Sequence, residues 1–169
     1  MQFIDYYIQN YSYSLFSTIE HYTDFNLTLL ENTPFYKEAF NELTFPFGKF
    51  YLFDTFVISE INEGILMNWD DHGKLVAEEL SHLYDHNGAN LIYISNRVHA
   101  YSVKPADWIK FFRFGYQIKG YGIINYNRKG YPNGLLEKLF IPSKVQRFSS
   151  LEKAIQWARN LSSVEMHIS

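Results

Sequence analysis

The chain has 169 residues, a formal net charge of −3 at pH 7 and no cysteine. It therefore has no disulfides, thiolate metal ligands or cysteine nucleophiles, and we expect a reducing, cytoplasmic location. Hydrophobic residues (47%) and charged residues (20%) occur in the usual globular mixture, and no apolar run approaches the roughly 20 residues of a membrane helix, so the composition predicts a folded domain without a membrane span.

Residues 1–48 form an acidic, aromatic-rich segment. Apolar residues between Ile4 and Tyr22 recur at steps of three and four, which predicts an amphipathic helix. A second, weaker helical stretch is expected from Pro34 to Leu43, because proline suits the first helical position. Such a segment is sticky when exposed, so we expect it to pack on its own domain or to form a homodimer contact.

The second part of the chain, residues 49–169, alternates strand and helix patterns that are typical of an α/β sheet. The strongest signal is the β-branched, aromatic run at 90–97, which predicts a strand buried on both faces. The expected elements are strands at 49–53 and 56–62, a helix capped by Asn68 and stopped by Asn87-Gly88, a strand at 91–95, a helix from Pro105, a strand at 121–126, a short helix at 135–140, a strand at 144–148 and a helix opened by the capping box Ser149-x-x-Glu152.

Two details of these elements bear on function. The Asp54-Thr55 connection predicts that the first two strands form an antiparallel pair at the sheet edge. Gly120 and Gly122 fall inside a strand, where they indicate close backbone packing and not a dinucleotide-binding loop.

This order of elements, together with the sequence from Arg147 to Ala158, resembles the SpoIIAA-like domains of the STAS superfamily, in which a late strand ends in Phe and a helix carries Ala-x-x-Trp. The stretches Val57–Ile61 and Tyr93–Arg97 are similar to those of uncharacterised bacterial proteins. The resemblance covers about residues 49–161. It implies an α/β fold with a mixed four- to five-stranded sheet and flanking helices, preceded here by the helical N-terminal segment.

The resemblance also implies a regulatory, non-enzymatic module that acts through protein contact and needs no cofactor. Some members of the superfamily are switched by phosphorylation of a serine in an Asp-Ser-x-Gly setting. This chain reads Ser95-Asn96-Arg97-Val98 at the corresponding place, without that Asp or Gly. Ser95 and Ser102 are the nearest candidates for modification.

Charge is divided unevenly along the chain, with 14 acidic residues against three lysines in residues 1–86 and 12 basic residues against four acidic ones in residues 87–169. The acidic part can fold against the basic part or against a second copy, and the alternative is a basic face for an anionic ligand. The pI near 6.0 argues against nucleic-acid binding.

Polar residues follow two buried strands at the ends where open α/β sheets bind ligands. If the strands are parallel neighbours, Arg97 and Arg128 can bind a carboxylate or phosphate, while a solvated basic rim is the alternative. The candidate residues are Asn96, Arg97, His99 and Tyr101 after one strand and Asn127, Arg128 and Lys129 after the other.

Catalytic and metal chemistry have little support in the sequence. His82 and His86 stand four apart on a helix, but no third ligand accompanies them, so no metal is expected. The chain has no nucleophile elbow and no P-loop. The leading hypothesis is a non-enzymatic STAS-like homodimer, and the alternatives are a carrier or sensor of a small anionic or lipid ligand and an enzyme with an unrecognised site.

Overall fold

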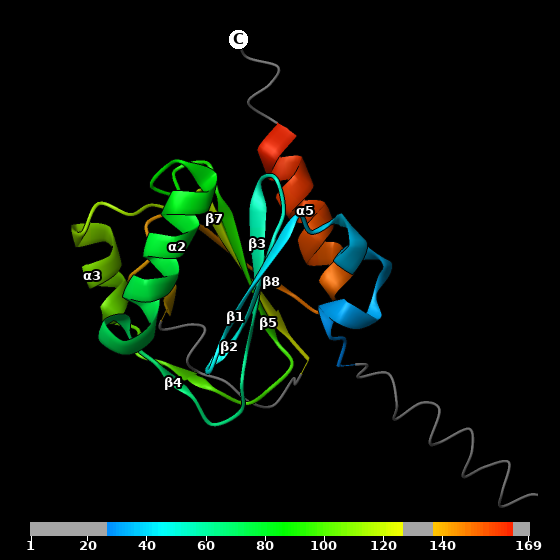
Figure 1. The fold of residues 1–169 in the computed structure, drawn as a ribbon, viewed down its shortest axis with the longest axis horizontal. Helices are drawn as coiled ribbons and strands as arrows, with labels where there is room; N and C mark the ends of the chain where they lie inside the picture. Colours follow the sequence, from blue (N-terminus) through cyan, green and yellow to red (C-terminus); the bar gives the residue numbers. More distant parts are fainter. Residues whose placement is uncertain (1–26, 127–136, 164–169) are drawn as a thin grey trace, which may run out of the picture.

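The computed structural model describes residues 27–126 and 137–163, which form a six-stranded sheet between two helical layers. Figure 1 shows α2 and α3 covering one face, and α5 with the turns at residues 30–38 covering the other. The sheet strands are β1 (Asn41–Phe45), β2 (Gly48–Leu52), β3 (Phe56–Ile61), β5 (Ile92–Arg97), β7 (Gly120–Asn125) and β8 (Lys144–Phe148). The remaining elements are 3₁₀ turns at Leu30–Asn32 and Pro34–Glu38, β4 (Leu66–Met67), β6 (Ser102–Val103), a π-helical turn at Trp69–Gly73, α2 (Lys74–Tyr84), α3 (Asp107–Arg113) and α5 (Leu151–Ser163).

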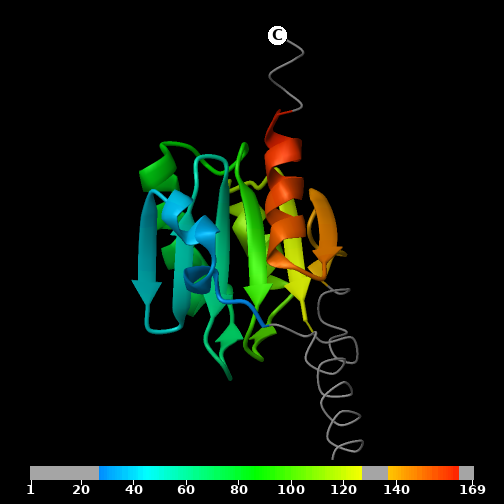
Figure 2. The same ribbon diagram turned by 90° about the vertical axis from the view of Figure 1, so that its right-hand side faces the viewer.

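The sheet is mixed, as predicted. Its order is β1-β2-β3-β5-β7-β8 (Figure 2). The pairs β1–β2 and β2–β3 are antiparallel, and the pairs β3–β5, β5–β7 and β7–β8 are parallel. The predicted antiparallel pairing of β2 with β3 is confirmed. Strands β5 and β7 are parallel neighbours, which is the condition that the anion-binding hypothesis required. No helix in the described ranges is long and apolar enough to cross a membrane.

Strand β1 corrects two predictions. The sheet has six strands, one more than the upper number expected, and β1 lies outside β2, so the β2–β3 pair is not at the edge. In place of the weak helix expected from Pro34 to Leu43, the structure has a 3₁₀ turn that ends at Glu38, because residues 41–45 pair with β2. The sheet thus begins before residue 49, and the helix expected between Ile4 and Tyr22 lies outside the described residues.

The helix ends follow side-chain capping, with two changes. The Oδ1 atom of Asn68 accepts the Asp71 N–H at 2.9 Å, as predicted. Helix α2 stops at Asp85, in the left-handed conformation (φ 57°), before the expected Gly88. At α5, Ser150 and not Ser149 accepts the Lys153 N–H, at 3.4 Å, because the chain needs two residues to turn after β8.

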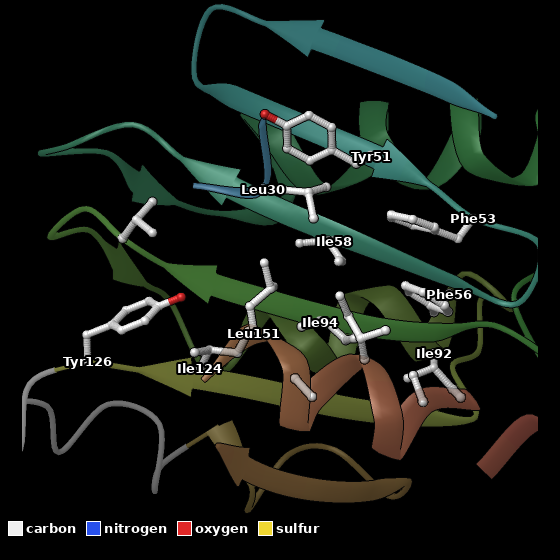
Figure 3. Packing of buried hydrophobic residues seen from close by; sticks show 14 residues of the cluster. Leu30, Tyr51, Phe53, Phe56, Ile58, Ile92, Ile94, Ile124, Tyr126 and Leu151 are labelled. Atoms are coloured by element: carbon white, nitrogen blue, oxygen red, sulfur yellow. The ribbon is translucent and has the colours of Figure 1, made fainter. Parts of the chain in front are cut away.

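Alternation along the strands gives each sheet face its own core. In β5, Ile92 and Ile94 pack in the cluster that includes α5, whereas Tyr93 lies on the α2 side. Figure 3 shows the α5 side, where Leu151 lies over Ile94 and Ile124. The outcome is two separate interiors, one on each side of a single sheet.

Gly120 and Gly122 pack closely, as the sequence predicts. A Cβ atom on Gly120 would lie 2.9 Å from the Trp157 ring and from Leu161, and one on Gly122 would lie 3.2 Å from the same ring. Glycine at these positions lets α5 approach β7.

Candidate ligand-binding cavity

A cavity of about 140 Å³ lies between the sheet and the α2/α3 layer. Its walls are mainly apolar and come from both layers. The lining includes Phe50, Trp69, Ala77, Tyr93, Trp108 and Tyr121. Concave, largely apolar spaces of this kind are the usual sites for small ligands.

Small residues and rigid aromatic residues both line the cavity. Gly73 and Ala77 lie one helical turn apart and line the cavity, so this stretch of helix contributes little side-chain volume. Elsewhere on the wall, the Trp108 ring lies 5.3 Å from the Tyr121 ring and 5.4 Å from the Phe111 ring, measured between centroids. These mutually supported rings do not collapse into the space that the small residues leave.

The charged groups on the cavity wall offset one another. Apart from His86, the charged lining residues are Lys104 and Asp107, whose charged atoms are 3.9 Å apart. The Asp107 carboxylate also accepts the Trp69 N–H at 2.7 Å and lies 3.8 Å from Lys110. Neither sign of charge therefore predominates in the cavity.

A buried polar network adjoins the cavity near the carboxyl ends of β5 and β7, and two of its residues, Tyr101 and Tyr121, line the cavity. The Arg97 guanidinium forms an ion pair with Glu137, and both side chains are almost fully buried, at 4% and 0% exposure. Tyr121 donates its hydroxyl to Glu137 at 2.7 Å, while Arg97 Nε donates to Ser95 Oγ at 3.3 Å. The hydroxyls of Ser95 and Tyr101 are 2.5 Å apart.

The network keeps its arginine charged and its phenols neutral. Burial opposes the charge on Arg97, but the paired Glu137 carboxylate and the Tyr121 hydroxyl oxygen that accepts from the guanidinium favour it, and the arginine pKa is raised. Burial raises the pKa of Tyr121 well above its usual value, and that of Tyr101 is also raised. The hydroxyls of Tyr101 and Tyr121 are hydrogen-bonded to neighbouring groups, so it is mainly the rings of these residues that face the cavity.

The structure separates the site residues that the sequence grouped together. Arg97 and Tyr101 join the network on the cavity side, whereas Asn96 points to the opposite face and His99 is exposed. Adjacent strand residues point to opposite faces, so Asn96 and Arg97 do not meet. The candidates Asn127, Arg128 and Lys129 lie outside the described residues.

The two serine candidates differ in exposure. Ser95 is fully buried, while Ser102 lies exposed in β6. Of the two candidates, only Ser102 is therefore accessible to solvent. Among the described residues, no group of three or more His, Asp or Glu side chains is placed to hold a metal, and His82 and His86 have no third ligand there.

A second buried polar cluster lies on the α5 face, around Glu60. Its Oε1 atom accepts the Leu30 N–H at 2.8 Å and the Asn96 side-chain amide at 2.7 Å, and its Oε2 atom accepts the Tyr51 hydroxyl at 3.4 Å. Burial raises the pKa of Glu60 above its usual value. The cluster holds the turn at residues 30–32 against the sheet.

Sequence reasoning missed Glu137 and the cavity itself. Glu137 lies 40 residues beyond Arg97, inside a predicted helix, and no spacing rule connects the two. Gly73 and Ala77 are small residues on one stretch of helix, but no sequence pattern shows which side chains surround them. When the chain is compared with protein-family models, curated proteins and solved structures, none of the three comparisons finds a match.

Proposed function

We propose that the protein binds a small, largely apolar molecule between the sheet and the α2/α3 layer, as a carrier or sensor. The observation that carries this proposal is the cavity of about 140 Å³ with its aromatic walls. An engineered apolar cavity of about 150 Å³ in another protein stays dry and binds benzene or xenon. No catalytic step is part of this proposal.

The cavity volume limits the ligand. Pockets for drug-sized molecules begin at roughly 300 Å³, so a whole lipid is too large for this space. The anionic ligand considered from the sequence has weaker support, because the Arg97 charge is already paired with Glu137. A small uncharged ligand agrees best with both observations.

Xenon binding tests the proposal without assuming the ligand's chemistry. We expect a saturable xenon NMR shift with the full-length protein, and we expect Ala77→Leu to abolish it because the added carbons occupy the cavity. His82→Leu is the control, since His82 is exposed on the same helix and does not line the cavity. Equal xenon binding by the native protein and Ala77→Leu, with both folded by circular dichroism, would overturn the proposal.

A second proposal is a STAS-like regulatory module of a bacterial cytoplasm that acts through protein contact. The two residues that carry the resemblance, Phe148 and Trp157, pack together with their ring centroids 5.3 Å apart. This contact supports a structural role for the motif. Exposed apolar side chains on the α2/α3 layer, including Ile109 and Phe114, support a contact surface.

Native mass spectrometry of the full-length protein tests the second proposal. We expect a homodimer that becomes a monomer when Ile109 and Phe114 are both replaced by Ser, if the α2/α3 layer is the contact. Replacement of the exposed Leu139 by Ser is the control for loss of surface apolar area. A monomer at all concentrations would contradict the homodimer.

A further inference from the structure

The electrostatics of the cavity restrict the charge of its ligand. Lys104 and Asp107 offset each other on the wall, and the Arg97 charge is used by Glu137 in the network behind it. An ion placed in the cavity would gain no unpaired counter-charge from these groups. Burial of an unpaired charge is far costlier than burial of a neutral group, so the cavity selects against ions.

The shape and chemistry of the walls restrict the ligand further. Tyr93, Tyr101 and Tyr121 face the cavity from the sheet side, and Trp69 and Trp108 face it from the helical side. The hydroxyls of Tyr101 and Tyr121 are already engaged with Ser95 and Glu137. Apart from the Trp108 N–H, which has no partner among the described residues, these aromatic residues offer ring faces and edges, which favour offset or edge-to-face contact with another ring.

We infer that the ligand is a neutral molecule with a single aromatic ring, bound among Trp69, Trp108 and the three tyrosines. This inference rests on the proposed function and adds the ligand's class to it. A single ring matches the cavity volume of about 140 Å³. We infer a neutral ligand because the charges on the cavity wall offset one another, and an aromatic ligand because the wall contains aromatic rings.

Four compounds of nearly equal size test the neutral charge and the aromatic ring of the ligand separately. Benzyl alcohol is the neutral aromatic probe, benzoate the anion, benzylammonium the cation and cyclohexylmethanol the neutral non-aromatic compound. Each is titrated into the full-length protein while the indole N–H signals are followed by two-dimensional NMR. Trp69 and Trp108 line the cavity, and Trp157 lies on the opposite face of the sheet, so one molecule holds both reporters and control.

We expect benzyl alcohol to shift the Trp69 and Trp108 signals saturably and to leave the Trp157 signal in place. Both ions should bind at least about tenfold more weakly, because neither finds an unpaired counter-charge on the wall. Cyclohexylmethanol should bind roughly two- to tenfold more weakly, which corresponds to the usual gain from a pair of aromatic rings. The Ala77→Leu variant should lose the response, and the His82→Leu variant should keep it.

Other results would overturn the inference in distinct ways. Benzoate or benzylammonium binding as tightly as benzyl alcohol would refute neutrality, and equal binding of cyclohexylmethanol would refute the aromatic requirement. Xenon uptake without binding of any ring compound would reject the ligand class and leave the proposed function intact. Absence of xenon uptake as well would reject both.

Discussion

Replacing Arg97 by Met should lower the free energy of unfolding by about 3–5 kcal/mol, because the change leaves the Glu137 carboxylate buried without its counter-charge. The Glu137 side chain has no exposed surface, so water cannot replace the guanidinium. The variant also loses the hydrogen bonds that Arg97 donates to Ser95 and Tyr121. Chemical denaturation at neutral pH measures the loss.

A surface ion pair and a double variant provide the controls. Arg159 pairs with Glu38 in a half-exposed setting, and Arg159→Met should cost only about 0–1 kcal/mol. Combining Arg97→Met with Glu137→Leu should recover part of the loss, because no buried charge then remains. A cost for Arg97→Met no larger than that for Arg159→Met would contradict this account of the network.

The Arg97 ion pair also affects how an anion-binding test is interpreted. Substitution of Arg97 removes a structural contact along with any contact to a ligand, so loss of binding in that variant would not identify a binding residue. Probes of ligand binding are better placed at Ala77, which lines the cavity and makes no polar side-chain contact. The structure thus moves the most informative substitution from the end of a strand to a helix.

Much of the fold follows from periodicity and local capping. The two-residue alternation and short apolar runs predict β2, β3, β5, β7 and β8, and the spacing of apolar residues predicts α2 and α5. These elements are long or strongly patterned, so tertiary contacts reinforce their local preferences. The glycines of β7 likewise have a local signal, because a strand interior accepts glycine chiefly where another element approaches.

Strand β1 and the cavity have no comparable signal. Residues 41–45 are half exposed, with Leu43 and Phe45 the apolar residues that pack on the core, so their alternation is too weak to distinguish a strand from the end of a helix. The cavity depends on where α2 and α3 place their side chains relative to the sheet, which a linear pattern does not contain. The separation of Asn96 from Arg97, in contrast, was available from strand alternation alone.

Glu60 should make the stability of the protein depend on pH in the opposite sense to a salt-bridged carboxylate. Burial raises its pKa above the usual value of 4.5, so the folded state binds the proton more tightly than the unfolded state does. Stability from this group is therefore fully present below about pH 4.5 and is lost as the pH rises through the folded-state pKa. Lys49, which stands opposite Glu60 in the β2–β3 register, does not offset this effect, because it pairs with Glu31 and Glu42.

Two substitutions of Glu60 separate its charge from its role as an acceptor. Glu60→Gln removes the titration and keeps an oxygen for the Leu30 N–H, so its stability relative to the native protein should improve as the pH rises from about 4 to 7. Glu60→Leu leaves buried donors of Leu30 and Asn96 without an acceptor and should cost about 1–3 kcal/mol for each. Hydrogen exchange should then accelerate at the Leu30 amide. Glu63→Gln, at an exposed glutamate just after β3, controls for loss of a surface carboxylate. A pH-independent difference between Glu60→Gln and the native protein would show that the Glu60 carboxylate carries no burial penalty.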